Sequence, residues 1–296
     1  MAQSGQSEEP YVLYRNTWSI RSLMIRLTLI STEEHPQQPN ITIKQKEVDI
    51  IHGEQLDEWF LCHINRKGQV PVLTHPIMFS EPVRESVDIS YYLCQFYPEL
   101  LPIDYRDQIK SLLHALHRLN FHVITFAKRP ERAAGLIKTT QERLSRSYNS
   151  EDYHRALEYK LSMLVHPGAS ILPDKTNPLF FFVDRITDPE EHNFSPEYIQ
   201  GQEDQVREIL DKATVIRNKH ASESPWIFGT RYATILDTHL IPVIVRLRDI
   251  GSTHLVGETM TLYAQCIVGT EMWTKLIGNQ PTTYVPGKSE PLAGDL

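Results

Sequence analysis

Two short segments of this chain carry residue types that can hold a ligand with a carboxylate. In the first, Glu85 and Ser86 precede a run with helical periodicity. A serine hydroxyl and the N–H groups at a helix N-terminus together bind carboxylates. The second is the apolar run 69–73, in which Pro71 cannot donate to a sheet ladder. The proline therefore leaves a backbone amide and carbonyl of this run without a ladder partner.

Three residues near the first predicted helix could stabilise an anion. Ser19 lies directly before the apolar-periodic run 20–30, where its hydroxyl can cap the helix or donate to a ligand. Tyr14 ends the first predicted strand and offers a second hydroxyl, or simply packs in the core. Arg21 adds a positive charge that favours an anion nearby, unless it is a solvated surface arginine.

A third group of polar residues repeats at helical spacing further along the chain. His114, His117, Arg118 and Phe121 should share one face of a helix, and His122 lies beside them. One of the histidines could polarise or protonate a leaving oxygen, or all could be ordinary residues of a helix bundle. A metal site is disfavoured because no carboxylate or cysteine joins the cluster at ligand spacing.

The predicted elements that position these residues change from mixed strands and helices to helices alone along the chain. The N-terminal part reads as β–α–β followed by further short elements, and a proline-bounded linker at 97–102 separates it from an almost wholly helical part. The expected strands are 11–15, 41–50, 70–74 and 77–80, and the expected helices are 20–30, 53–61, 86–96, 104–128, 141–166, 196–220, 234–250 and 258–277. Thr234 and Asp237 have the spacing of a capping box.

Composition limits the function. The chain has 296 residues, 41% of them hydrophobic, and a net charge of −7, so a nucleic-acid-binding protein is not indicated. No apolar run reaches the ~18 residues of a membrane span. The three cysteines are scattered, which argues against a disulfide framework or a zinc site and favours a reduced, cytoplasmic setting. Residues 1–10 lack a signal-peptide pattern, and we expect them to be disordered.

In their order and spacing, four segments resemble the cytosolic glutathione transferase superfamily over residues 11–278. The segments are Leu13, Tyr14, Ser19, Arg21 and Arg26; then 65–73; then 85–93; and finally 226–229 with Thr234, Asp237 and His239. The details are similar to the fungal branch, whose members include a transferase that opens the epoxide of trichothecene toxins. The chain departs from the pattern in extra sequence near 129–148 and 167–195, and in Arg21, where a small residue or cysteine is expected.

The resemblance implies an α/β fold of two parts. A thioredoxin-like, glutathione-binding domain at 11–97 would precede an all-α helical domain at 104–280, and a flexible tail would follow at 281–296. Such folds usually pair as symmetric homodimers. The resemblance also implies glutathione as co-substrate, bound by Lys67, Gln69, Val70, Pro71, Glu85 and Ser86. The bond before Pro71 should be cis, Ser86 should hold the γ-glutamyl carboxylate, and Glu85 should face the γ-glutamyl amine.

The same resemblance implies how the thiol would be used. Ser19 is the favoured donor to the glutathione sulfur, Tyr14 is its rival, and Arg21 could assist. Residues expected to line the second-substrate pocket are Trp18, His114, His117, Arg118 and Phe121. The expected activity is conjugation of the glutathione thiolate to an apolar electrophile, with an epoxide-bearing toxin favoured and detoxification as the outcome. The alternatives are a glutathione-dependent isomerase or lyase, and a glutathione-binding protein without turnover.

Overall fold

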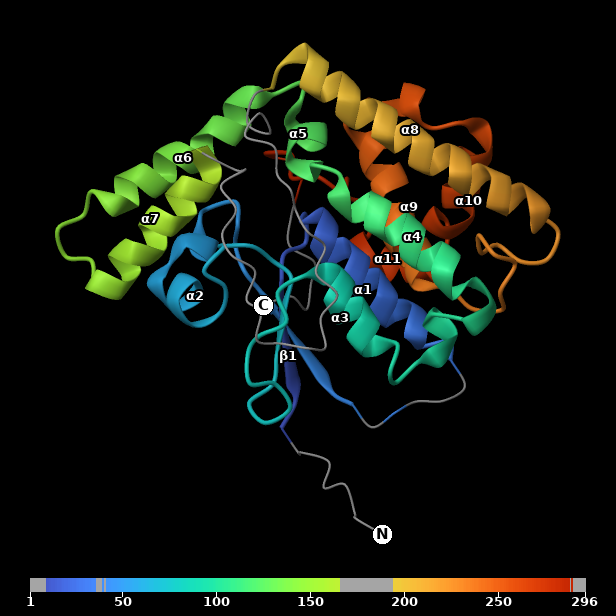
Figure 1. Cartoon of the computed structure of the whole chain (residues 1–296), viewed down its shortest axis with the longest axis horizontal. Coiled ribbons are helices and arrows are strands. Elements are labelled where there is room, and N and C mark those ends of the chain that lie inside the picture. The colour runs from blue at the N-terminus through green and yellow to red at the C-terminus, as the bar shows by residue number, and fades with distance from the viewer. Residues whose placement is uncertain (1–8, 36–38, 40, 166–193, 288, 290–296) are drawn as a thin grey trace, which may run out of the picture.

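The computed structural model describes residues 9–35, 39, 41–165, 194–287 and 289 (Figure 1). Residues 1–8 of the expected disordered lead-in and almost all of the extra segment near 167–195 lie outside these residues. In the described part of the chain an α/β half precedes a helical half, as the sequence predicts. No helix in this part is long and apolar enough to cross a membrane.

The N-terminal half contains a three-stranded sheet with the strand order β2–β1–β3. β1 is parallel to β2 and antiparallel to β3, and Leu13 lies opposite Gln45 on one side and Leu73 on the other. The elements of this half are β1 (Tyr11–Arg15), α1 (Ile20–Thr32), β2 (Ile43–Glu47), α2 (Glu58–His63), β3 (Val72–Thr74) and α3 (Ser86–Leu93). The parallel pair with α1 between its strands is the expected β–α–β unit.

The strand expected at 77–80 does not form. Ile77 and Met78 lie in a turn, where their backbone N–H groups donate to Nδ1 of His75 at 3.1 and 3.0 Å. The residue that pairs with β3 lies further along the chain than expected: Leu73 and Val83 exchange two backbone hydrogen bonds, at 2.9 and 2.8 Å. A side-chain acceptor directly after β3 thus turns the chain, and strand propensity alone does not reveal it.

The C-terminal half is helical, but three of its expected long helices are divided. Asn120 ends the first one early, since its side chain accepts from the N–H of Val123 at 3.1 Å and starts a new helix. Ser150 and Thr270 precede new helices in the other two. The helices are α4 (Arg106–Arg118), α5 (Phe121–Phe126), α6 (Pro130–Leu144), α7 (Glu151–Val165), α8 (Pro196–Lys219), α9 (Ile235–Asp249), α10 (Glu258–Val268) and α11 (Glu271–Ile277).

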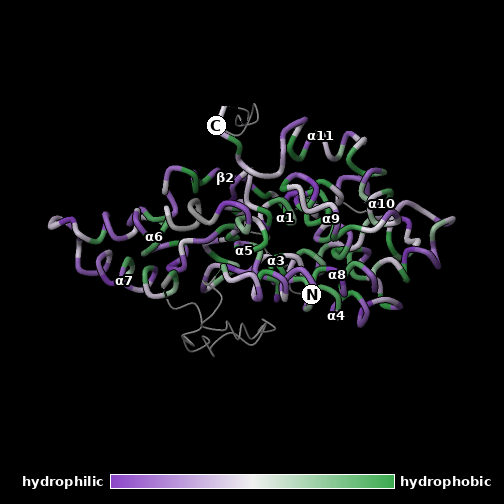
Figure 2. Tube along the Cα trace, turned by 90° about the horizontal axis from the view of Figure 1, so that it is seen from above, coloured by the Kyte–Doolittle hydropathy of each residue, from purple (hydrophilic) through white to green (hydrophobic). Residues whose placement is uncertain are grey.

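The two halves share one hydrophobic core, in which α1 packs along α9 at the centre of the molecule (Figure 1). Leu23 and Leu240, on these two helices, are 0% exposed, and burial of one such side chain contributes about 1.5–3 kcal/mol. Thr28 and Thr238 add a buried hydrogen bond of 2.7 Å between their hydroxyls. Figure 2 shows hydrophobic stretches along α1 and α9 and many hydrophilic stretches along α6 and α7.

The start of α9 carries the capping box that the sequence predicts. The Thr234 hydroxyl accepts from the N–H of Asp237 at 3.4 Å, and the Asp237 carboxylate accepts from the N–H of Thr234 at 2.7 Å. Asp237 also accepts from the N–H of Ile227 at 2.8 Å and from the hydroxyl of Tyr263 at 2.6 Å. One buried carboxylate therefore fixes the start of α9 against the turn before it and against α10.

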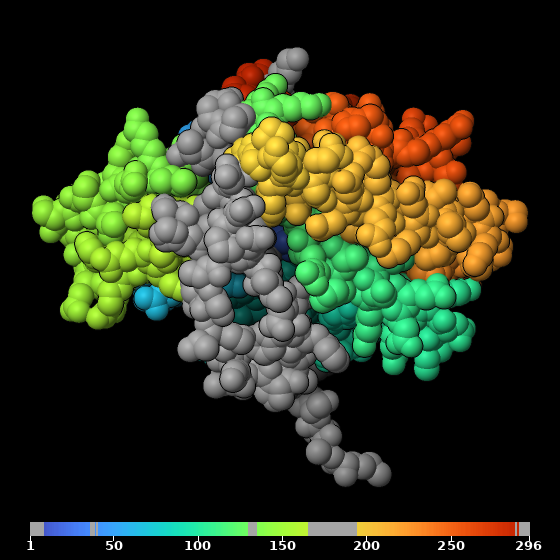
Figure 3. Space-filling model, turned by 45° about the horizontal axis from the view of Figure 1, so that its top comes forward, coloured from blue at the N-terminus to red at the C-terminus, as the bar shows by residue number. Residues whose placement is uncertain are grey.

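Part of the extra sequence near 129–148 forms a helical hairpin with α7 that packs against α2. Arg143 forms an ion pair with Asp57, and the Tyr153 hydroxyl donates to the carbonyl of Leu56 at 2.7 Å. Leu61 and Leu157 are the buried contacts between the helices. In the space-filling view α6 and α7 form one lobe of the molecule, apart from α4 and α8 (Figure 3). The hairpin therefore supports the segment that leads into the candidate site.

Candidate functional site

The N-terminus of α3 has the features of a carboxylate-binding site. Glu85 precedes the helix with an extended backbone, and its side chain makes no capping hydrogen bond. Ser86 is 1% exposed, and its Oγ has no hydrogen-bond partner among the described residues. A buried hydroxyl without a partner costs about 1–3 kcal/mol. A ligand carboxylate that meets Ser86 would remove this cost and would also meet the N–H groups of the first helical turn.

The loop before Pro71 brings the other expected glutathione-binding residues close to α3. The Val70–Pro71 peptide bond is cis, as expected. Asn65 holds the loop, because its side-chain amide donates to the carbonyl of Gln69 at 2.8 Å. Gly68 has φ +55, and a Cβ there would lie 3.1 Å from the carbonyl oxygen of Gln55. The loop is thus fixed in a conformation that favours glycine at this position.

Two lysines tie this loop to its surroundings. Lys67 reaches Glu85, with Nζ 2.8 Å from Oε1, so the two expected ligand-binding residues are paired with each other. Lys160, on α7, donates to the carbonyl oxygen of Lys67 at 2.7 Å. Burial lowers the pKa of Lys160 to about 8. The sequence analysis did not single out Lys160, because its partner is a backbone carbonyl of a distant loop.

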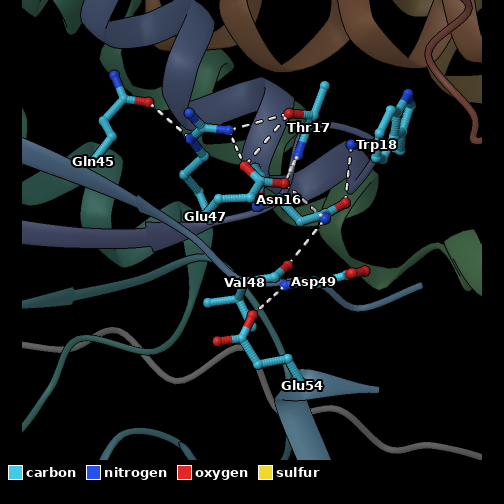
Figure 4. Close-up of polar contacts among 10 residues, drawn as sticks. Asn16, Thr17, Trp18, Gln45, Glu47, Val48, Asp49 and Glu54 are labelled. Carbon is cyan, nitrogen blue, oxygen red and sulfur yellow. Dashed lines mark hydrogen bonds and ion pairs between the residues drawn. The ribbon is translucent and has the colours of Figure 1, made fainter. Parts of the chain in front are cut away.

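Glu47 holds the turn at residues 16–18, directly before Ser19 in the sequence (Figure 4). Its carboxylate accepts from the N–H of Thr17 and from the side-chain amide of Asn16, both at 2.9 Å, and it pairs with Arg15. Asn16 in turn accepts from the N–H of Trp18 at 3.0 Å. Ser19 then caps α1, and its Oγ accepts from the N–H of Ser22 at 3.4 Å. This long capping bond uses an acceptor site only, so the hydroxyl hydrogen of Ser19 can still be donated.

Arg246, a buried residue of α9, fixes the same turn from the helical half. Its guanidinium donates to the carbonyl of Trp18 at 2.8 Å and to the hydroxyl of Thr282 at 3.1 Å. Burial lowers the pKa of Arg246 to about 10, which leaves it charged at neutral pH. Trp18 is half-buried, and its indole packs edge-on against Tyr284 at a centroid distance of 5.1 Å. Sequence reasoning missed Arg246 and Tyr284, since only the tertiary fold brings them to Trp18.

Tyr14 lies in a different environment from Ser19. Its ring contacts Trp59 at 5.9 Å and Phe60 at 6.2 Å between centroids, and Nζ of Lys46 lies 5.5 Å from its ring centroid. Burial raises the pKa of Tyr14. The ring of Tyr14 thus packs beside α2.

The structure brings Arg21, His117 and Phe121 together and leaves His114 and Arg118 apart from them. The Arg21 guanidinium lies 2.9 Å from Nδ1 of His117 and 5.5 Å from the ring centroid of Phe121. His117 is 3% exposed, whereas His114 and Arg118 face solvent. The single helical face expected for these residues is broken, because α4 ends at Arg118 and Phe121 belongs to α5.

Asp88 is a further titratable residue of the site that sequence reasoning missed. It lies in the first turn of α3, two residues after Ser86. Burial, with a smaller contribution from the charge of Glu85, raises its pKa from 3.8 to about 7, and Lys67 opposes the shift. Its Oδ1 is buried without a hydrogen-bond partner among the described residues. Strongly shifted pKa values cluster at functional sites, which makes Asp88 a candidate site residue.

Within the residues that the structure describes, no group of three or more His, Cys, Asp or Glu side chains is arranged to hold a metal ion. The candidate site instead offers a buried hydroxyl at the N-terminus of α3, the cis Val70–Pro71 bond and a second hydroxyl at the start of α1. A small peptide with a terminal carboxylate fits this donor set.

The sequence matches no protein-family model, and no curated protein shows significant sequence similarity to it. Solved structures do resemble it. A Sulfitobacter glutathione transferase homologue with bound glutathione matches at a TM-score of 0.51 and 16% identity, covering 90% of this chain and 96% of that one. Maleyl pyruvate isomerase, a bacterial glutathione S-transferase of the Zeta class, matches at a TM-score of 0.51 and 13% identity, covering 92% of this chain and 100% of that one. A mutant of human glutathione S-transferase T1-1 matches at 0.50 and 13%, covering 94% of each chain. At these identities the likeness shows the fold.

Proposed function

We propose that this chain, which has the fold of the cytosolic glutathione transferases, binds glutathione and transfers its thiolate to an apolar electrophile. The observation that carries the proposal is Ser86, whose buried Oγ has no partner among the described residues and lies at a helix N-terminus. The γ-glutamyl carboxylate of glutathione is a ligand for this position. The backbone of Val70 would meet the cysteinyl part.

Activation of the thiol is the chemical task of the site. A free thiol has a pKa of about 8.5, so little thiolate exists at neutral pH, and a shift of ~2 units needs about 2.7 kcal/mol of preferential thiolate binding. Ser19 supplies a hydroxyl donor at the N-terminus of α1, and the helix dipole favours the same anion. Arg21, in the first turn of α1, adds a positive charge.

An epoxide is the electrophile that we favour, because the sequence resembles the fungal branch of the superfamily, whose members include a transferase that opens a toxin epoxide. The glutathione sulfur attacks a ring carbon and forms a C–S bond while the C–O bond of the ring breaks. The resulting alkoxide takes a proton from solvent or from a nearby donor. The partly exposed Trp18 and Tyr284 pack edge-on and provide an apolar surface beside the start of α1, which suits an apolar second substrate.

Mass spectrometry of reaction mixtures tests the proposal. The protein is incubated with glutathione and a panel of epoxides, activated aryl halides and unsaturated ketones, and products are compared with mixtures that lack protein. Protein-dependent products that contain glutathione support a transferase. A product isomeric with its substrate, formed only when glutathione is present, would instead show an isomerase. Binding of glutathione without any product would show a binding protein.

We extend the proposal to assembly and location. A symmetric homodimer is proposed from the fold, and sedimentation at micromolar concentration tests it, since a clean monomer would contradict it. Cys62, Cys94 and Cys266 are free thiols, which suits the reducing cytoplasm.

A further inference from the structure

A continuous hydrogen-bonded chain of side chains crosses from α1 to α3 through the helical half. Arg21 Nη1 lies 2.9 Å from His117 Nδ1, and His117 Nε2 lies 2.8 Å from His239 Nδ1. His239 Nε2 then lies 2.7 Å from the Oγ of Ser90. The four residues come from α1, α4, α9 and α3, so the chain leaves the N-terminal half and returns to it.

The chemistry of Arg21 fixes the direction of every bond in the chain. A guanidinium only donates, so Nδ1 of His117 must accept and its proton must sit on Nε2. That proton is donated to Nδ1 of His239, which places the His239 proton on Nε2, directed at Ser90. Both imidazoles are therefore neutral and each is held in one tautomer.

The hydrogen-bonded side chains are buried, which restricts their rearrangement. His117, His239 and Ser90 are 3%, 0% and 0% exposed. Burial, together with the positive charge of Arg21, lowers the pKa of His239 to about 3, so the neutral form persists at neutral pH. The guanidinium also lies over the ring of Phe121. Arg21 is thus held from two sides, by a hydrogen bond in its plane and by an aromatic face.

Both ends of the chain lie on elements of the proposed glutathione site. Arg21 is in the first turn of α1, two residues after Ser19. Ser90 is on α3, one helical turn after Ser86. An arginine on an exposed helix surface samples many rotamers, and its charge is then averaged and screened. A guanidinium fixed beside a helix N-terminus instead acts continually on an anion bound there.

We propose that His117, His239 and Ser90 are positioning residues that hold the Arg21 guanidinium where it stabilises the sulfur anion of bound glutathione. This inference rests on the proposed function and assigns its charge stabilisation to a buried histidine pair. His117 acts through Arg21 and does not need to contact the electrophile. The exposed His114 and Arg118 have no part in this role.

Matched substitutions at His117 test the proposal in the full-length protein with glutathione as the probe. Gln at this position can accept from Arg21 through its carbonyl oxygen and donate to His239 through its amide, whereas Leu can do neither. The apparent pKa of the bound thiol, measured by ultraviolet absorbance of the thiolate, should rise by about one unit in Arg21→Met and in His117→Leu. It should stay near the wild-type value in His117→Gln. Glutathione affinity should change less than about threefold, because Ser86 and Val70 are untouched.

A double substitution and variants at His239 distinguish a positioning role from a general packing defect. Once Arg21→Met is present, adding His117→Leu should not raise the thiol pKa further. If His117→Leu does not fold, His239→Leu and His239→Gln provide the same comparison, with the Gln variant near wild type. Equal pKa shifts in the Leu and Gln variants would indicate a general packing defect and would overturn the inference.

The failure of this inference can be told apart from the failure of the proposed function. Wild-type protein that binds glutathione and forms thiolate, with no change of thiol pKa in Arg21→Met, contradicts the positioning role alone. Wild-type protein that forms no thiolate with glutathione contradicts both.

Discussion

Lys67 and Glu85 form an ion pair that connects the loop before Pro71 with the N-terminus of α3, with 2.8 Å between Nζ and Oε1. Their side chains are 35% and 29% exposed, so the pair itself contributes only about 0–1 kcal/mol. Its effect on neighbouring charges matters more. Lys67 offsets the negative charge of Glu85 beside Asp88. Its positive charge would also favour the carboxylate that we propose to bind at Ser86.

Ser86→Ala should weaken glutathione binding without weakening the fold. The substitution removes a donor to a charged carboxylate, worth about 1.5–3 kcal/mol, so the Kd should rise roughly 10- to 100-fold. Because the buried Oγ has no partner among the described residues, its loss should leave the free energy of unfolding unchanged or slightly higher. Calorimetry and urea unfolding measure the two quantities. Replacement of the exposed Ser111 by Ala is the control. Unchanged glutathione affinity in Ser86→Ala would show that the γ-glutamyl carboxylate does not bind at Ser86.

Asp88→Asn should stabilise the fold at alkaline pH. The pKa of Asp88 is raised from 3.8 to about 7, so the folded state prefers its protonated form. The stability that this preference contributes is present below pH 4 and is lost as the pH rises toward 7. Asn stays neutral throughout, so the variant should gain stability over wild type at pH 8 and little at pH 4. Urea unfolding at both values checks this, with the exposed Asp211→Asn as control. An equal effect at both pH values would contradict the raised pKa.

His239 should make the protein less stable in acid. Its pKa falls from 6.5 to about 3 on folding, so its contribution to stability is present above pH 6.5 and is lost as the pH falls toward 3. At pH 5 the loss from this residue is about 2 kcal/mol. His239→Gln keeps a donor and an acceptor but cannot titrate. The difference between the unfolding free energies at pH 8 and pH 5 should therefore shrink by about that amount, and an unchanged difference would refute the assignment.

Glu47→Gln should loosen the turn that carries Ser19. The carboxylate accepts from Thr17, Asn16 and Arg15, and an amide can replace only part of this, since its NH₂ group would face donors. We expect a loss of about 1–3 kcal/mol in the free energy of unfolding, and a raised pKa of the glutathione thiol. The exposed Lys44→Gln on the same strand should change neither. A Glu47→Gln variant as stable as wild type would show that the turn holds without the carboxylate.

The parts of the fold that local signals determine could be predicted. The strand at Tyr11–Arg15, the Ser19 cap of α1 and the capping box of Thr234 and Asp237 follow from propensity and side-chain spacing, and all are present. The cis bond before Pro71 followed from the family resemblance. The break of the long helix at Asn120 was missed, although asparagine is a good N-cap, because helical periodicity continues across it.

The residues that support the candidate site could not be predicted, because their partners are distant in sequence. Glu47 binds the turn at Thr17 from 30 residues away, and Arg246 reaches Trp18 from 228 residues away. His117 was expected to line a pocket, yet it is buried against His239. The sequence around a histidine in an apolar helical run does not indicate its partner. Only the tertiary structure therefore reveals the row of hydrogen-bonded side chains that includes Ser90.

The pH dependence of turnover in Ser19→Ala tests the central claim most directly. The variant loses the proposed hydroxyl donor to the sulfur but keeps the glutathione contacts at Val70 and Ser86. Glutathione affinity should stay similar, the bound thiol's pKa should rise, and turnover at neutral pH should fall by roughly 10- to 1000-fold, with partial recovery as the pH increases. Tyr14→Phe should leave the pH–rate profile unchanged. A Ser19→Ala profile that matches wild type, with the loss of activity in Tyr14→Phe instead, would contradict the assignment of Ser19.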